Sequence, residues 1–421
     1  MDDRLLFLSA DIELYMNILK IYTHSFRGLS PESWMLAVVM LINRSGSMVL
    51  PFLGIYMTDY LGFKIETAGL VLSCFGIGSV VGSWLGGMIT DKIGEFKVQF
   101  LSLFLSVPLF CLMPFFKTEI SLAIIMFLQS SVTECFRPAN SVAITKYAKK
   151  GNITRSFSLN RMAVNLGFSI GPAMGGILSA ISYDFLFFFN AAGALISGIV
   201  YVRFFRKRQS VDRKIIKKVN LVKERSPYLD MKFLFFSFLC LLFAVCFFQL
   251  LSTLTIFYKV EAGLSQQAIG YILGFSGIFI VILEMLLVNF AEKRMGLGFT
   301  LFLGTIFCGA GYAMLGIWST IPMLILSISL MSIGEIWVLP FTSTVTAIRS
   351  GENNKGAYMG TLGIGFAISF IITPFLGTHI AETYGFRMLW FGTGVLLVLT
   401  AIGYYLIVPS MLKEQQEIQK P

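Results

Sequence analysis

Long apolar stretches, separated by short polar segments, follow one another along almost the whole chain. An α-helix needs roughly 20 mostly apolar residues to cross the hydrocarbon core of a bilayer, and each stretch reaches about that length. The pattern predicts twelve spanning helices, at residues 33–58, 66–90, 96–116, 119–146, 153–181, 184–205, 229–258, 266–290, 298–318, 323–348, 357–381 and 386–409. The expected fold class is therefore an all-α membrane protein.

The second half of the chain repeats polar, glycine and proline positions of the first half at an offset of about 201–202 residues. The repeat-related pairs are Tyr56 and Tyr258, Gly69 and Gly270, Gly76 and Gly277, Asp91 and Glu292, Glu134 and Glu335, Pro138 and Pro340, Pro172 and Pro374, and Gly175 and Gly377. A hydrophobic chain with one internal repeat predicts two pseudo-symmetric six-helix bundles that rock about a shared axis. A transporter is the first hypothesis.

Basic residues predict the orientation of the helices. The segments that follow even-numbered helices carry most of the lysines and arginines, and the central segment adds a dense basic cluster. Because cytoplasmic loops are enriched in Lys and Arg, both termini and this segment are predicted to be cytoplasmic, in a plasma (inner) membrane. The expected parts are a cytoplasmic segment 1–32, bundles 33–205 and 229–410, a basic linker 206–228 and a cytoplasmic tail 411–421. We interpret the linker charge as topogenic rather than as a nucleic-acid site.

Composition excludes several function classes. Of the 421 residues, 56% are hydrophobic and only 13% are charged, which is more apolar surface than a soluble fold can bury. The 6 cysteines show no metal-ligand or disulfide spacing, and the 2 histidines, His24 and His379, cannot complete a Ser-His-Asp set. The sequence therefore predicts neither a metal site nor a cofactor, and no enzyme.

Two segments carry recognisable motifs. The segment after the second helix contains Gly87, Asp91, Gly94 and Lys97, and the fifth helix contains Gly167, Gly171, Pro172, Gly175 and Gly176. The first resembles the loop 2–3 motif of the major facilitator superfamily, and the second resembles the helix 5 motif of its drug:proton antiporters. Residues 43–53 and 134–140 are similar to a bacterial multidrug-efflux-type subgroup. The resemblance covers nearly the whole chain.

The resemblance implies a role for Asp91 in a cytoplasmic gate latch that holds the outward-facing state. It also implies a central cavity lined by helices 1, 4, 7 and 10. The chain departs from the family pattern in two places. The Arg-x-x-Gln-Gly pattern of helix 4 is absent, and in the second-half loop motif Val288 replaces the glycine and Glu292 replaces the aspartate.

Ionisable residues inside membrane helices are costly and mark functional sites. Arg44, Glu134 and Glu335 are expected at similar depth, and we predict an ion pair between Arg44 and Glu134. Glu335 has no basic mate in the second half, so it is the first candidate for proton carrier, before Glu134. Glu284 is a further candidate. The alternative is that these charges only brace the bundles.

Two more arginines and several aromatic residues complete the candidates. Arg137 and Arg161 are expected to brace the bundles, pair with Asp91 or Glu134, or contact an anionic group of the substrate. The cavity candidates are Tyr56, Phe136, Arg137, Gln249, Trp337 and Phe341. Aromatic side chains with few polar groups favour an amphipathic organic ligand.

The function predicted is a secondary active transporter that exports a small amphipathic compound by alternating access, in exchange for protons. The expected partners are the substrate, protons and the lipid bilayer, without nucleic acid, and the expected unit is a monomer driven by the proton gradient. Alternatives are proton-coupled uptake of a nutrient or small peptide and a lipid or lysolipid flippase. A membrane enzyme, a channel or a receptor would be a different class.

Overall fold

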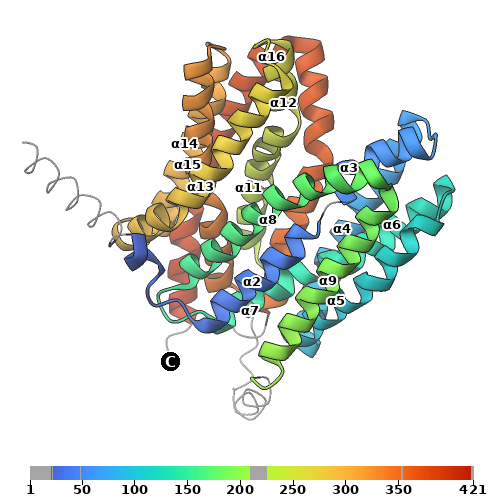
Figure 1. Cartoon of the computed structure of the whole chain (residues 1–421). Coiled ribbons are helices and arrows are strands. Elements are labelled where there is room, and N and C mark those ends of the chain that lie inside the picture. Colours follow the sequence, from blue (N-terminus) through green and yellow to red (C-terminus); the bar gives the residue numbers. More distant parts are fainter. Residues whose placement is uncertain (1–19, 21, 48, 209–224, 352–353, 419–421) are drawn as a thin grey trace, which may run out of the picture.

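The computed structural model describes residues 20, 22–47, 49–208, 225–351 and 354–418, and all regular elements within these ranges are helices. Figure 1 shows two groups of helices, one blue to green and one yellow to red, that meet at one end of the molecule. Near the other end, α3 and α12 lie apart. Most of the predicted segment 1–32, much of the linker and the last three residues lie outside the described ranges.

The first bundle consists of α2 (Pro31–Ser45), α3 (Val49–Ile55), α4 (Ile65–Ile93), α5 (Glu95–Leu112), α6 (Glu119–Glu134), α7 (Phe136–Tyr147), α8 (Ile153–Ile181) and α9 (Tyr183–Phe205). The second consists of α11 (Met231–Phe248), α12 (Thr253–Val260), α13 (Gln266–Arg294), α14 (Leu297–Leu315), α15 (Ile321–Arg349) and α16 (Lys355–Ile418). α16 joins two helices across Gly385, whose φ of 83° lies outside the helical region. The all-α prediction of two six-helix bundles is confirmed.

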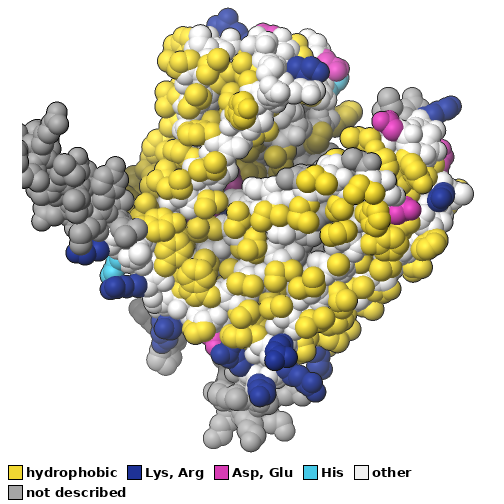
Figure 2. Space-filling view, viewed as in Figure 1, with side chains coloured by type: hydrophobic (Ala, Val, Ile, Leu, Met, Phe, Trp, Pro, Cys, Tyr) yellow, Lys and Arg dark blue, Asp and Glu magenta, His cyan; other side chains and the backbone are white. Residues whose placement is uncertain are grey.

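The bilayer prediction agrees with the helices observed. Within the described residues, 10 helices are long and apolar enough to cross a membrane, and the last of these contains two of the predicted spans. On the face shown in Figure 2, exposed apolar side chains cover much of both bundles, while Lys and Arg gather toward the end where the bundles meet. The protein is therefore a multi-pass membrane protein. The predicted domain boundaries and the tail at 411–421 stay predictions.

Two predicted spans are not continuous helices, which corrects the sequence prediction. The first span breaks between Ser45 and Val49, and the seventh breaks at Gln249–Leu251, where the backbone forms a 3-10 turn. The fourth span stays one helix from Glu119 to Tyr147, because Cys135, between α6 and α7, keeps helical backbone angles of φ −61° and ψ −25°. The first and seventh breaks lie at repeat-related positions. Hydropathy cannot reveal them because the apolar pattern runs through each break, yet broken helices near mid-membrane often form binding sites.

The helix 5 motif packs α8 against the broken end of α2. A Cβ atom added at Gly167 would lie 2.6 Å from Cβ of Arg44, and one added at Gly171 would lie 3.2 Å from the Arg44 carbonyl oxygen. Only glycine permits this approach of the two backbones. Gly175 is buried and Gly176 is exposed, and Pro172 lies in α8 with its side chain outside the described part. The motif thereby fixes the position of Arg44.

Candidate functional site

Arg161 of α8 joins the two bundles by binding two carboxylates of the second bundle. Its Nε donates to Glu284 Oε1 of α13 at 2.9 Å, and its Nη1 donates to Glu335 Oε1 of α15 at 2.6 Å. Ser158, also on α8, donates its hydroxyl to Glu284 Oε1 at 2.7 Å. We call these four residues, Ser158, Arg161, Glu284 and Glu335, the central cluster. Both carboxylates are buried, and Glu284 is fully enclosed.

The central cluster corrects the prediction that Glu335 lacks a basic partner. That prediction considered only the second half of the chain, where no lysine or arginine lies at a matching position. The partner comes from the first half instead, because α8 packs on both α13 and α15. One guanidinium faces two carboxylates, so the cluster carries a formal charge of −1 when both acids are ionised. Oε2 of Glu284 is buried without a hydrogen-bond partner among the described residues.

The predicted ion pair between Arg44 and Glu134 is wrong in this conformation. Glu134 Oε2 pairs instead with Nη2 of Arg137 at 3.0 Å, three residues further along the same span. Arg137 is nearer along the chain and reaches the carboxylate across the turn at Cys135. The Arg44 guanidinium lies over the ring of Phe168, with Cζ 5.6 Å from its centre.

The aromatic cavity candidates are buried side chains. Tyr56 stacks on Tyr60 and packs at a tilt against Tyr183, and the indole N–H of Trp337 donates to the Leu287 carbonyl at 3.2 Å. Phe136 and Phe341 are buried, and so is Gln249, whose amide donates to Thr393 at 3.1 Å. Among the six candidates, only Arg137 exposes a large part of its side chain, 40%. Contact of all six candidates with substrate stays a prediction.

Asp91 binds the start of a helix in the opposite bundle. Its two carboxylate oxygens accept hydrogen bonds from the backbone N–H groups of Gly356 at 2.6 Å and Ala357 at 2.7 Å, in the first turn of α16. The partial positive charge at a helix N-terminus favours an anion at this place. The motif residue Gly94 ends α4 with a φ of 89°, and Lys97 is exposed on α5. We call the end of the molecule that contains this contact the closed end.

Glycines allow this contact to be short. A Cβ atom at Gly87 would lie 2.4 Å from the Gly356 carbonyl oxygen, and a Cβ atom at Gly356 would lie 2.3 Å from the Gly87 carbonyl oxygen. Real Cβ atoms do not approach other atoms so closely, so neither position accepts a larger residue without movement of a helix. The first glycine of the loop motif thus brings α4 and α16 together, and its aspartate then reaches the helix start.

Glu292, the repeat mate of Asp91, makes the matching contact on the other side of the interface. Its Oε2 pairs with Nε of Arg155 at 2.9 Å, in the first turn of α8. Each bundle therefore places an acidic residue from the end of a helix against the start of a helix in the other bundle. The departure from the family motif is explained by geometry, because the longer glutamate binds an arginine side chain rather than backbone N–H groups.

Residues 25–28 close the interface beside Arg155, a feature that the sequence did not reveal. Nη1 of Arg155 donates to the carbonyls of Ser25 at 3.4 Å and Arg27 at 3.1 Å, and Asn152 donates to the Gly28 carbonyl at 2.8 Å. From the second bundle, Asn289 donates to the Ser25 hydroxyl at 3.4 Å. The segment before α2 therefore contacts both bundles at the closed end.

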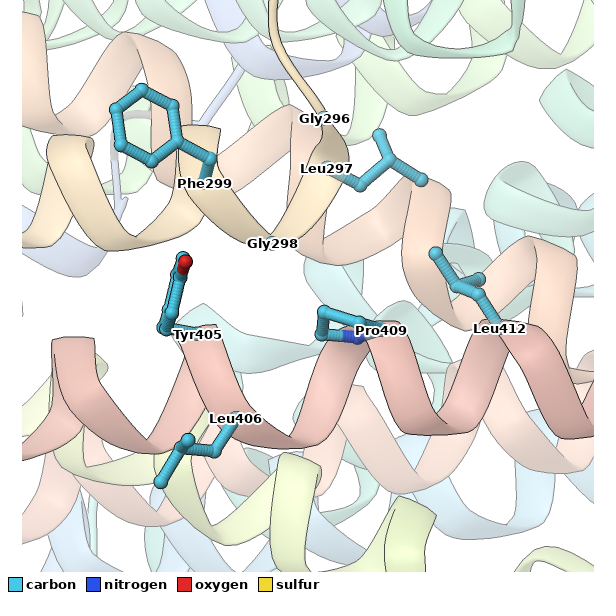
Figure 3. Close-up of a pocket in the computed structure, with 8 residues that line it drawn as sticks. All are labelled: Gly296, Leu297, Gly298, Phe299, Tyr405, Leu406, Pro409 and Leu412. Atoms are coloured by element: carbon cyan, nitrogen blue, oxygen red, sulfur yellow. The ribbon is translucent and has the colours of Figure 1, made fainter.

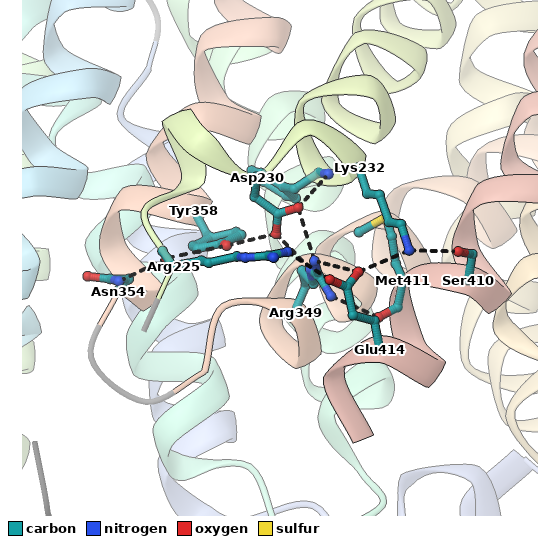
Figure 4. Close-up of polar contacts among 10 residues, drawn as sticks. Arg225, Asp230, Lys232, Arg349, Asn354, Tyr358, Ser410, Met411 and Glu414 are labelled. Atoms are coloured by element: carbon teal, nitrogen blue, oxygen red, sulfur yellow. Dashed lines mark hydrogen bonds and ion pairs between the residues drawn. The ribbon is translucent and has the colours of Figure 1, made fainter. Parts of the chain in front are cut away.

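A buried ion pair fixes the start of α16 from within the second bundle (Figure 4). Arg349 donates two hydrogen bonds to the Asp230 carboxylate, at 2.7 and 3.0 Å, and Tyr358 donates a third at 3.0 Å. Burial alone would raise the pKa of Asp230, but these bonds and the backbone N–H of Phe233 hold it below its ordinary value. Tyr358 lies next to Ala357, so the network positions the N–H groups that bind Asp91.

The same network reaches the last helical turns of the chain. Glu414 accepts from Arg349 at 3.2 Å, from Arg225 at 2.7 Å and from Lys232 at 3.0 Å. Arg225 lies near the end of the predicted linker 206–228, and Lys232 lies in the first turn of α11. The end of α16 is therefore tied to both the linker and the start of the second bundle.

Two other features do not extend the site. The described part of the chain contains no group of 3 or more His, Cys, Asp or Glu side chains arranged to hold a metal. A shallow groove of about 480 Å³ lies between the start of α14 and the end of α16, and it is lined by apolar residues such as Leu297, Phe299 and Leu406 (Figure 3). It contains none of the predicted cavity residues.

Comparison with known proteins finds one family over most of the chain. A sequence model described as Major Facilitator Superfamily matches residues 34–321 and 263–420. The uncharacterized MFS-type transporter YttB of Bacillus subtilis (strain 168) is 26% identical and covers 91% of this chain and 97% of its own. Multidrug resistance protein MdtG of Salmonella heidelberg (strain SL476) is 28% identical over 166 residues, 38% of this chain and 41% of its own.

Solved structures share the fold. The human organic anion transporter MFSD10 (TETRAN) superposes with a TM-score of 0.71 at 15% identity, covering 89% of this chain and 99% of that one. A bacterial homologue of the iron transporter ferroportin, in an outward-facing state, gives a TM-score of 0.70 at 15% identity, covering 88% and 98%. At this identity the likeness concerns the fold alone.

Proposed function

Since the chain belongs to the Major Facilitator Superfamily, we propose that it is a secondary active transporter that exports a small amphipathic organic compound in exchange for protons. The proposal of export draws on the similarity to MdtG and to a multi-drug resistance efflux pump PmrA homolog of Lactococcus lactis, each matched over part of the chain. The alternatives are proton-coupled uptake of a nutrient or small peptide, and flipping of a lipid or lysolipid. No catalytic reaction is proposed.

The observation that carries the proposal is the central cluster, in which one guanidinium holds carboxylates of the opposite bundle. Protonation of Glu335 or Glu284 would remove a charge that Arg161 binds. Loss of one partner of a buried ion pair costs about 3–5 kcal/mol. A proton that enters the cluster would therefore weaken the interface between α8 and the pair α13 and α15, which is the coupling that an antiporter requires.

The closed end supplies the other half of the cycle. The Asp91 and Glu292 contacts hold the bundles together there, while the surface is hollowed between the bundles on the side away from it (Figure 2). With the orientation that the basic residues predict, the closed end is cytoplasmic and the cleft faces outward. Both termini are then cytoplasmic, in a plasma (inner) membrane. The proposed unit is a monomer that draws energy from the proton gradient and needs no cofactor.

Transport by reconstituted protein tests this function. Purified protein in proteoliposomes would be given a panel of fluorescent amphipathic compounds with and without an imposed pH gradient. We expect the gradient to drive accumulation of at least one compound, and Glu335→Gln to abolish this drive while leaving exchange down a compound gradient. Glu382→Gln, which changes an exposed glutamate of α16, is the matched control. Unchanged pH-driven transport by Glu335→Gln would remove Glu335 from the coupling role.

A further inference from the structure

We propose that Arg44 binds an anionic group of the substrate, a carboxylate or a group of similar charge and shape, so that this transporter selects amphipathic anions or zwitterions. The inference rests on the proposed function and names the substrate class for it. It arises from an ion pair that the sequence predicts and the structure does not contain.

Arg44 is a partly buried guanidinium near the end of α2, in the first predicted span. Among the described residues no carboxylate lies within ion-pair distance of it, and its Nε is buried without a hydrogen-bond partner. A buried charge is normally paired because its desolvation is otherwise uncompensated. The face of an aromatic ring, at 5.6 Å, attracts a cation only weakly and satisfies none of the guanidinium N–H groups. The fold therefore maintains an unused anion-binding group.

The surroundings of Arg44 include a face of α8 that is turned toward the second bundle. Phe168, under the guanidinium, is 48% exposed. It shares a helix face with Asn165 and Arg161, at spacings of three and four residues, and Arg161 points to the second bundle. Nδ2 of Asn165 is a second buried donor without a partner among the described residues. An exposed ring with two unused donors beside it suits a ligand that has an apolar body and an anionic end.

The charge balance favours an anion at this place. The first bundle contributes Arg44, Glu134 and Arg137, which interact electrostatically with one another and sum to +1. Because Glu134 is bound to Arg137, the excess positive charge falls on Arg44. A guanidinium also matches a carboxylate geometrically, since it can donate two parallel hydrogen bonds. A cationic ligand would add to the repulsion here.

This assignment separates two tasks that the proposed cycle needs. The acids of the central cluster, Glu284 and Glu335, would take the protons, and Arg44 would take the charge of the substrate. The two sites lie on different helices, Arg44 on α2 and the acids on α13 and α15 of the second bundle. Binding of the substrate anion can therefore be measured without a proton gradient.

The test uses three fluorescent probes that differ mainly in charge: dansylglycine, dansylglycinamide and dansylethylenediamine, which are anionic, neutral and cationic. Binding to full-length protein in nanodiscs at fixed pH is followed by dansyl emission. We expect dansylglycine to bind on the order of tenfold more tightly than the amide. Arg44→Gln should remove this preference, Arg44→Lys should retain part of it, and the exposed control Arg387→Gln should leave it unchanged.

Each result bears on the inference. Equal binding of acid and amide by the unsubstituted protein overturns it, and so does tightest binding of the cation or absence of dansylglycine binding at millimolar concentration. Amide binding by Arg44→Gln reports that the variant is folded. If Arg44→Gln loses acid and amide binding equally, while Arg44→Lys binds both as the unsubstituted protein does, the inference is also overturned. Anion binding that depends on Arg44 without any transport supports the inference and contradicts the proposed function. Transport without any preference for the anionic probe supports the proposed function and contradicts the inference.

Discussion

The guanidinium of Arg161 lies 2.6 Å from the carboxylate of Glu335, although these residues belong to opposite halves of a repeated chain. The same guanidinium binds Glu284, so a single side chain of the first bundle neutralises part of the charge of two acids in the second. The repeat is symmetric in its scaffold and asymmetric in its charges. In the proposed cycle, protons bind the acids of this unequal pairing and so change how tightly the two bundles are held together.

Replacement of Arg161 by methionine should be severely damaging. It leaves Glu284 and Glu335 buried without their counter-ion, which costs about 3–5 kcal/mol of stability for this conformation unless a proton is taken up. We expect a lower Tm in detergent and loss of pH-driven transport. A double-mutant cycle with Glu335→Gln should give a coupling of about 1–3 kcal/mol between the two sites. Additive effects would show that the contact contributes no interaction energy.

Gly356→Ala should open the closed end. The added Cβ would meet the Gly87 carbonyl at 2.3 Å, and this atom belongs to a helix backbone that cannot rotate away. We expect a shift toward conformations in which the ends of α4 and α16 separate, measured as a longer distance between spin labels on the two helices. Gly392→Ala is the matched control in the same element, because nothing lies within 4 Å of its added Cβ. An unchanged distance distribution for Gly356→Ala would contradict the close contact.

The two acidic contacts at the closed end should act together. Asp91→Asn weakens charge-assisted bonds to the start of α16, and Glu292→Gln removes the ion pair with Arg155, each by about 1–3 kcal/mol. We expect each variant to raise solvent access to the closed end in hydrogen exchange of α8 and α16, and the double variant to raise it further. Exchanging the charges, Glu292→Arg with Arg155→Glu, should restore part of the protection at α8.

That restoration will be incomplete, because Arg155 also donates to the carbonyls of Ser25 and Arg27. A glutamate at this position cannot donate to them. Full recovery would mean that residues 25–28 contribute nothing to closure. No recovery at all would mean that the contact between Glu292 and Arg155 is incidental.

Hydropathy predicts most of this fold because a bilayer imposes the length of each helix and leaves few alternatives. The contact of Asp91 with the opposite bundle is also predictable, because it lies in a motif whose glycine permits the close approach and whose acid makes the bonds. The partners of the buried charged residues are not predictable in this way. Glu134 pairs with the nearer Arg137 instead of Arg44. The partner of Glu335, Arg161, lies 174 residues away in the other half of the chain. Pairing of that kind depends on how two bundles meet, which local sequence does not encode.

The buried pair of Asp230 and Arg349 predicts an acid dependence of stability. The pKa of Asp230 is lowered in the folded protein, so its ionised form stabilises the fold at pH values above the ordinary carboxyl pKa near 4. This contribution is lost as the pH falls through the lowered pKa. Asp230→Asn should therefore lower the Tm at pH 7, by an amount equivalent to about 1–3 kcal/mol, and its Tm should fall less steeply below about pH 4.

Thermal unfolding in detergent between pH 3 and pH 7 measures both effects. Asp59→Asn, which alters an exposed aspartate of the first bundle, is the matched control and should keep the acid dependence of the unsubstituted protein. Since Tyr358 links Asp230 to the start of α16, Asp230→Asn should also loosen the Asp91 contact and increase hydrogen exchange of α16 near Ala357. A stability loss at pH 7 without increased hydrogen exchange near Ala357 would show that the pair of Asp230 and Arg349 supports the second bundle alone and not the Asp91 contact.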